Sequence, residues 1–257
     1  YPYNLIFHQI YAVFLYFCRG FLKSINYNYM NKLFILTMAS LVAFSCTDKK
    51  AQLQTLLTEI ESKVAPLANE VALAQWNGSV SGNEEDFKKS EIAQQKLTKY
   101  LSDKEIFAQI KKFKESGIFN NVASSDEQSL LLKRQLDVVY NYFLANQADT
   151  NLLNEIIAKS TKLEKAYGSY RAQLNGKPIN DNEVENILHT SVNNKELQAV
   201  WESHKGIGKV VVNDLIDLVK MRNKLAKSLG FDNYHTMSLT LSGQDPKEIT
   251  AILDELD

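Results

Sequence analysis

The residues from Asn194 to Leu241 constrain the fold more than any other part of the chain, because they read as one very long amphipathic helix, a glycine that stops it and a short helix. Apolar side chains recur at every third or fourth position, which puts them on one face of a helix with about 3.6 residues per turn. This stripe consists of Leu197, Trp201, Ile207, Val211, Leu215, Leu218, Leu225 and Leu229. Gly230 then predicts the C-terminal end of the helix, and a short helix is expected after it.

Two polar residues, His204 and Arg222, interrupt this stripe. An arginine on an apolar face indicates one of two arrangements. Either its guanidinium reaches a buried partner, or its stem lies along the apolar surface and the charged group reaches water. The periodicity of the helix is compatible with both arrangements of the arginine.

Glycine and proline are scarce, since 257 residues include only 10 Gly and 4 Pro, and this indicates long uninterrupted helices and an all-α fold. Apolar periodicity predicts further helices at 51–76, 84–101, 102–117, 124–143 and 149–170. Asn77-Gly78 is expected to end the first of these helices. Capping boxes at Ser102 with Glu105 and at Ser124 with Glu127 are expected to open the third and the fourth.

The remaining elements are short. A turn at 175–178 is the one place where a hairpin is expected, and residues 180–189 predict a short helix. Asp245 and Pro246 predict the N-cap and the first residue of a last helix. Heptads are not sustained between the helices, so a globular bundle is favoured over a coiled-coil rod.

The N-terminal part of the chain predicts an export signal that begins at Met30 rather than at Tyr1. Residues 1–29 are apolar and aromatic, but their longest apolar run is shorter than the ~20 residues that span a bilayer, so we interpret them as upstream sequence. Residues 30–46 have one lysine, an apolar core and small residues before a cysteine, as export signals do. The mature segment is then 47–257.

The ending of this signal, Ala43 to Cys46, resembles a bacterial lipobox, which implies lipidation at Cys46 and a membrane anchor through the lipid. The alternative is an ordinary secretory signal in which the cysteine occurs by chance. The polar residues Thr47 to Lys50 favour a lipid tether. Because Thr47 rather than an aspartate follows the cysteine, the resemblance implies the outer membrane of a bacterial envelope, on the periplasmic side.

Charge and cysteine content exclude several classes of function. The segment after Cys46 has a small net negative charge and no basic block, which argues against nucleic acid as a partner. It also contains no cysteine, so neither disulfides nor thiolate metal sites are available to it. No sequence feature specifies an oligomeric state.

The residues themselves predict no active site. The histidines after Cys46, at 189, 204 and 235, are too far apart to share a helical turn, and no H-E-x-x-H motif occurs. We interpret them as surface or partly buried histidines rather than metal ligands. Nucleophile-elbow, P-loop and dinucleotide-binding motifs do not occur either.

Two stretches nevertheless resemble the angiotensin-converting-enzyme-like zinc peptidases. The first runs from Glu61 to Asp103 and includes the segments Glu-Ser-Lys-Val-Ala-Pro, Ala-Gln-Trp-Asn and Lys-Tyr-Leu-Ser-Asp. The second includes Trp201-Glu202, the segment Leu218 to Asn223 and the segment Leu229 to Tyr234. These stretches occur in the family's order, and the resemblance covers residues 50–257.

The resemblance implies a large helical ellipsoid that is divided by a deep channel and closed by N-terminal helices acting as a lid. The family builds its zinc site from H-E-x-x-H and a more distant glutamate, in the later half of the domain. We therefore interpret this chain as an N-terminal fragment that contributes the lid and part of one half. It should be inactive alone, and no catalytic or zinc-ligand residue is assigned in it.

Two single residues gain interest from the resemblance. Lys205 falls where animal members have an arginine that binds an activating chloride. Lysine keeps the charge but loses the planar fork, which puts chloride activation in question and leaves a solvent-exposed lysine as the alternative. Arg222 belongs to a pair with Asn223 that carries part of the resemblance. We expect its partner to be a carboxylate or a carbonyl, either in this chain or in the later half of the family's domain.

Three functions follow as hypotheses. In the first, the complete protein is a zinc-dependent dipeptidyl carboxypeptidase, anchored by lipid at Cys46, that hydrolyses short peptides outside the cytoplasm. In the second, it is a related helical zinc oligopeptidase that cleaves internally. In the third, it is a lipid-anchored helical binding protein without catalytic activity.

Overall fold

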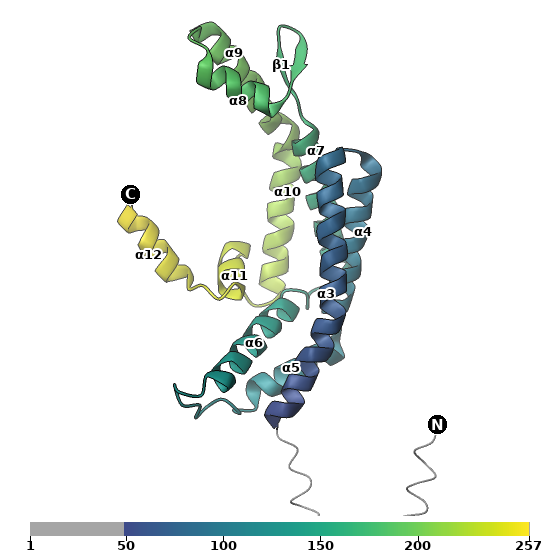
Figure 1. Ribbon diagram of the computed structural model, residues 1–257, viewed down its shortest axis with the longest axis vertical. Helices are drawn as coiled ribbons and strands as arrows, with labels where there is room; N and C mark the ends of the chain where they lie inside the picture. Colours follow the sequence, from purple (N-terminus) through teal and green to yellow (C-terminus); the bar gives the residue numbers. More distant parts are fainter. Residues whose placement is uncertain (1–48, 257) are drawn as a thin grey trace, which may run out of the picture. The chain divides into compact units, whose positions relative to one another are not determined.

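The structure, a computed structural model, describes residues 49–256. Figure 1 shows its elements, whose bounds are α3 (Lys49–Ser81), α4 (Glu84–Leu101), α5 (Lys104–Glu115), α6 (Glu127–Leu144), α7 (Thr150–Ser169), β1 (Ala172–Leu174), β2 (Lys177–Ile179), α8 (Asp181–Thr190), α9 (Asn194–Lys205), α10 (Ile207–Ser228), α11 (Tyr234–Leu241) and α12 (Pro246–Leu256). The prediction of an all-α fold is confirmed. The expected signal at 30–46, Cys46 and residues 1–29 lie outside the described residues.

The chain divides into two units, Tyr1–Gln52 and Leu53–Asp257, and three hydrophobic clusters lie in the second. The first cluster joins α3, α4, α5 and α6. Its buried members are Leu53, Leu57, Ile60, Leu101, Ile110, Leu132, Leu136 and Phe143. The Phe143 ring is fully buried and meets the Tyr100 ring edge-on at 6.0 Å between centroids, a favourable geometry for an aromatic pair.

The second cluster lies where α7, α10 and α11 meet, and Figure 1 shows α7 running beside α10. Its buried members are Ala148, Leu152, Leu153, Leu225, Ala226 and Met237. α4 packs on α7 and is also joined to it by an ion pair between Glu84 and Lys165. Among the helices within 49–256, none is long and apolar enough to cross a membrane.

The third cluster is smaller and joins the hairpin to α8 and α9. It consists of the buried Ala172, Val184 and Val200 with neighbouring partly buried side chains. The strands pair antiparallel, with Ala172 opposite Ile179, so the expected hairpin at 175–178 is confirmed. Its turn places Asn175 at φ 52° and Gly176 at φ 77°, the left-handed conformations that favour these two residue types.

Several expected helix ends are correct because they depend on local chemistry. Asn180 caps α8 in a capping box with Glu183, and Asp245 accepts hydrogen bonds from the first backbone N–H groups of α12. Gly230 follows α10 at φ 87°, and Phe231 N donates to Ala226 O at 3.0 Å. These are the endings that the sequence predicts.

Two expected capping residues are wrong. Asp103, not Ser102, caps α5, since its carboxylate accepts hydrogen bonds from the backbone N–H groups of residues 105 and 106. The Ser102 hydroxyl instead donates to Thr98 O at the end of α4. Asp126, not Ser124, caps α6. In both cases a carboxylate nearer the helix has the added attraction of the positive helix end.

The expected end of the first helix at Asn77-Gly78 is also wrong, because α3 continues to Ser81. Gly78 is buried, and a Cβ there would lie 3.4 Å from the Phe87 ring of α4, so this glycine permits close helix packing rather than a turn. The chain turns instead at Gly82, which has φ 67° and donates its N–H to Gly78 O.

The long helix predicted from Asn194 is two helices, α9 and α10, separated at Gly206. The hydroxyl of Tyr170, which caps the end of α7, donates to Ser203 O at 2.6 Å. That carbonyl would otherwise accept the N–H of Ile207 in a continuous helix. A side chain from outside the helix therefore interrupts the ladder at this point.

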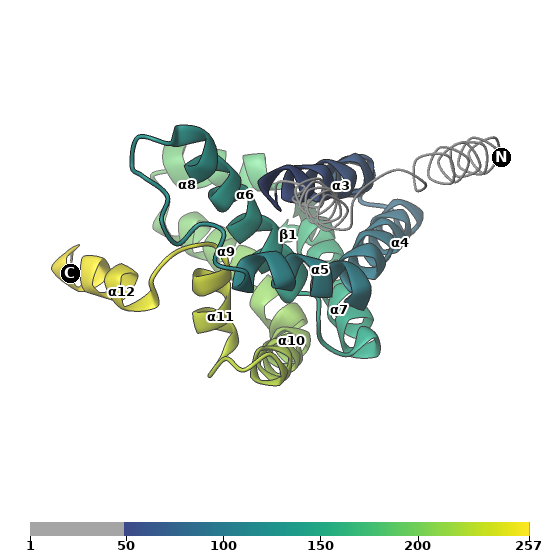
Figure 2. The same cartoon turned by 90° about the horizontal axis from the view of Figure 1, so that it is seen from below.

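The apolar stripe of this region is only partly buried. Ile207, Leu218 and Leu225 are buried, as predicted, but Trp201 and Leu215 are about half exposed. A second face of α10 is exposed and apolar, and it consists of Val212, Leu215, Ile216 and Val219. α12 buries no residue and extends away from the other helices in both views (Figures 1 and 2).

Candidate functional site

The three histidines lie apart. His189 on α8 and His235 on α11 are exposed, and His204 is partly buried in the last turn of α9. Its Nδ1 lies 3.9 Å from Asp181 Oδ1 and has no hydrogen-bond partner among the described residues. Within residues 49–256, no group of three or more His, Cys, Asp or Glu side chains could hold a metal ion. These residues therefore do not fit a zinc site.

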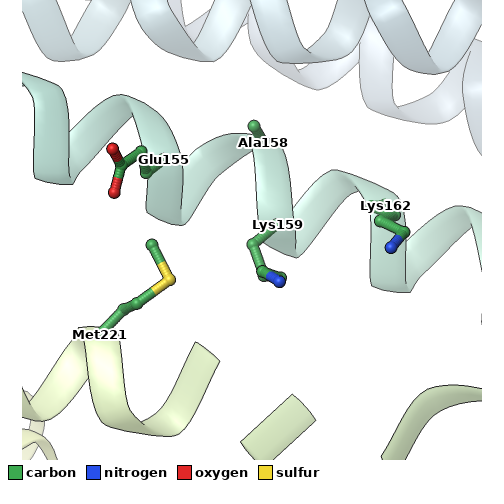
Figure 3. A pocket seen from close by; sticks show the side chains of 5 residues that line it. All are labelled: Glu155, Ala158, Lys159, Lys162 and Met221. Atoms are coloured by element: carbon green, nitrogen blue, oxygen red, sulfur yellow. The ribbon is translucent and has the colours of Figure 1, made fainter. Parts of the chain in front are cut away.

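The candidate site that the geometry does offer is an open hollow between α7 and α10 (Figure 3). Four of its five lining residues follow one face of α7 at helical spacing, and the fifth comes from α10. They are Glu155, Ala158, Lys159, Lys162 and Met221. In Figure 3 the Met221 side chain points from α10 toward α7, beneath Glu155.

Charged groups connect the two helices beside this hollow. Lys159 Nζ lies 2.9 Å from Asp214 Oδ1, and Lys162 Nζ lies 2.6 Å from Asp214 Oδ2. The hydrogen bonds from Lys162 and Lys159 hold the pKa of the Asp214 carboxyl below its ordinary value. The same hydrogen bond from Lys159 to Asp214 raises the pKa of the Lys159 ammonium.

This network favours fixed charges over proton transfer. Asp217 adds a weaker contact with Lys159, at 3.8 Å. Because Asp214 is held ionised and Lys159 is held protonated, neither is suited to act as a general acid or base near neutral pH. The ion pairs beside the hollow therefore connect α7 to α10. The paired lysines on α7 and paired aspartates on α10, each three residues apart, were the sequence signal for these ion pairs.

Arg222 follows Met221 on α10 and is partly buried. Its Nη2 donates to Ser160 Oγ on α7 at 3.4 Å, and its guanidinium lies 5.2 Å from the centroid of the Tyr234 ring. Its Nε is buried without a hydrogen-bond partner among the described residues. Partial burial raises the pKa of the Glu164 carboxyl, and the Arg222 charge opposes that shift. Among the described residues, Arg222 thus contacts a hydroxyl and an aromatic ring, and a carboxylate or carbonyl partner on another part of the protein stays a prediction.

Asn223 completes this arrangement. Its side-chain oxygen accepts the backbone N–H of Tyr234 at 2.9 Å, which fixes the start of α11 against α10. Arg222 and Asn223 therefore both act on Tyr234, one on its ring and one on its backbone. Through these contacts Arg222 and Asn223, which carry part of the family resemblance, connect α10 to α7 and α11. Lys205, by contrast, is exposed at the end of α9.

We expect Asp214→Asn to destabilise the protein at neutral pH, because it removes the carboxylate that two lysines hold. The folded-state pKa of Asp214 is lowered, so its contribution is complete above the unfolded pKa, near 3.8, and is lost as pH falls through the folded pKa. The stability gap between wild type and variant should close in strong acid. Urea unfolding from pH 7 to about pH 2 measures this gap. Asp217→Asn is the control and should show a smaller gap; a gap that persists unchanged in acid contradicts the assignment.

We expect Arg222→Leu to lower the free energy of unfolding by about 1 kcal/mol, because it removes the Ser160 hydrogen bond and the contact with the Tyr234 ring. Arg222→Lys keeps a charge near the ring and should cost less. Urea unfolding of the complete protein provides the measurement. The control is Lys224→Leu, an exposed position two residues along the same helix. If Arg222→Leu is as stable as wild type, the arginine merely extends along the surface to water.

Comparison with known proteins gives one result that bears on the whole segment. The family model of angiotensin-converting enzyme, a peptidase family, matches residues 47–256. The match covers all of the described helices and both stretches on which the resemblance rests. No curated protein matches the sequence. The chain therefore belongs to the angiotensin-converting enzyme family of peptidases.

Proposed function

We propose that the complete protein is a zinc-dependent dipeptidyl carboxypeptidase that removes dipeptides from the C-terminus of short peptides outside the cytoplasm. The observation that carries this proposal is the family match over residues 47–256. Because the described residues do not fit a zinc site, the proposal assigns zinc binding and catalysis to other parts of the protein. Residues 49–256 then supply lid and wall, and would be inactive alone.

The exposed apolar faces support this division of roles. Val212, Leu215, Ile216 and Val219 form a continuous stripe on α10, and α12 exposes Ile252, Leu253 and Leu256. Such faces are costly to leave in water and mark surfaces that other protein covers. A catalytic domain that continues beyond these helices would bury them.

Two alternative functions are an internally cleaving peptidase and a protein that binds without cleaving. A related helical zinc oligopeptidase would share the fold and the metal but would cleave inside its substrate. A lipid-anchored binding protein would share the fold without any hydrolysis. The family match favours a peptidase over a binding protein, and the position of the cleaved bond separates the two peptidases.

The test is a cleavage assay with the complete coding sequence. We expect purified protein to release C-terminal dipeptides in succession from an unstructured peptide, as measured by mass spectrometry. Removal of the metal with a chelator should abolish release, and zinc should restore it. Residues 47–257 alone are the inactive control. Internal fragments would identify an oligopeptidase, and the absence of any cleavage with zinc present would leave the binding protein.

We also propose that lipid at Cys46 anchors the protein to the outer membrane of a bacterial envelope, on the periplasmic side. We expect the protein expressed from Met30 in bacteria to incorporate labelled fatty acid and to remain with the membrane fraction. Cys46→Ser should lose both the label and the membrane association, while Cys18→Ser, in a longer product that begins at Tyr1, should change neither. A Cys46→Ser protein that still carries the label would contradict the proposal, and an unlabelled, soluble wild type would indicate an ordinary secretory signal.

A further inference from the structure

The segment from Ala172 to Lys205, which comprises β1, β2, α8 and α9, forms a lobe with its own core. Ala172, Val184 and Val200 are at most 3% exposed and belong to one cluster. The buried residues of α7, α10 and α11 belong to another. In Figure 1 this hairpin lobe lies at one end of the α7–α10 pair. Segments with separate cores can open or move as separate units.

Two backbone connections join the hairpin lobe to the α7–α10 pair. The side chain of Tyr170, which lies at the first connection, reaches the residues of the second. The first connection is at Tyr170, the C-cap of α7, and the second is at Gly206, between α9 and α10. The Tyr170 hydroxyl donates to Ser203 O at 2.6 Å, in the last turn of α9. By contrast, the bond from Gln173 N to Ser203 Oγ, also 2.6 Å, lies wholly within the lobe.

Gly206 provides the space that this contact needs. A Cβ at this position would lie 2.4 Å from the Tyr170 hydroxyl oxygen and 2.9 Å from Ser203 O. The backbone of Gly206 has φ −55°, which any residue adopts, so the requirement is for room and not for an unusual conformation. Any side chain here would displace the hydroxyl.

The Ser203 carbonyl can accept hydrogen bonds from different donors in two arrangements of the chain. In the structure Ser203 O accepts the Tyr170 hydroxyl and the N–H of Gly206, the latter at 3.1 Å. In a continuous helix it would accept the N–H of Ile207. Residues 194–228 contain no proline and carry an apolar stripe that runs through the junction, so their sequence is compatible with one straight helix.

We propose that the hairpin lobe pivots as a unit about Tyr170 and Gly206, and that the Tyr170 hydroxyl is the latch that holds it in the position seen here. With the latch closed, the chain bends between α9 and α10. With the latch open, Ser203 O binds the Ile207 N–H and α9 continues into α10. The Ile207 N–H takes the place of the Tyr170 hydroxyl, so the carbonyl has a hydrogen-bond donor in both states. The pivot carries the exposed Trp201 ring with it, and it does not depend on the peptidase function.

The test measures the angle between α9 and α10 in the complete protein. Paired spin labels at the exposed positions Lys195 and Lys224 report the distance along the two helices. A straight helix between them spans about 44 Å, at about 1.5 Å per residue, and the bent form is shorter. We expect wild type to give the shorter distance and Tyr170→Phe to shift the distribution toward about 44 Å.

Two variants control for side effects. Tyr167→Phe removes a hydroxyl from an exposed tyrosine on the same helix, and Ser203→Ala removes only the bond inside the lobe. Both should keep the wild-type distance. Gly206→Ala should act like Tyr170→Phe, because the added Cβ displaces the hydroxyl.

Amide hydrogen exchange distinguishes a movement of the intact lobe from unfolding of the lobe. Amides around Val184 and Val200 should stay protected in Tyr170→Phe, because the core of the lobe is intact in both states. An unchanged distance in Tyr170→Phe and Gly206→Ala would overturn the proposal. So would loss of protection throughout α8 and α9, since the hydroxyl would then stabilise the lobe itself rather than its position.

Discussion

The packing of α7 along α10 is the contact on which the second half of the described structure depends. α4 packs on α7, while α9 and α11 contact α10, so these elements are placed by the pair. Apolar burial near Leu225 and Ala226 supplies the nonspecific attraction, and the bonds from Lys159 and Lys162 to Asp214 add direction. Ion pairs that are partly open to water add little net stability, so their main effect is to fix the register of the two helices.

Polar side chains connect this helix pair to neighbouring helices at two places. At one place Arg222 and Asn223 hold the ring and the backbone of Tyr234, which sets the start of α11. At the other place Tyr170 reaches the last turn of α9. Hydrogen bonds specify angle and distance more narrowly than apolar contacts do, so these few groups define the bends between helices.

The structure combines buried apolar clusters with exposed apolar faces. The described residues have well-packed clusters, but they also leave a stripe of α10 and most of α12 without apolar cover. The two lysines that line the α7–α10 hollow form ion pairs with Asp214.

The sequence by itself determined the helical class, the hairpin turn and the ends at Gly230, Asn180 and Asp245. These features depend on neighbouring residues, whose backbone preferences and hydrogen bonds act over three or four positions. The family could also be predicted from two stretches that occur in the family's order, because a sequence resemblance does not depend on knowing the tertiary contacts.

Tertiary structure decided the features that depend on distant side chains. α3 runs past Gly78, which lies against Phe87 of α4, and the helix from Asn194 divides at Gly206, where Tyr170 binds a carbonyl 33 residues away in sequence. The partner of Arg222 was equally hidden, since Ser160 lies on another helix. Periodicity reports which face of a helix is apolar, but only the packed neighbours determine which part of that face is buried and where the helix bends.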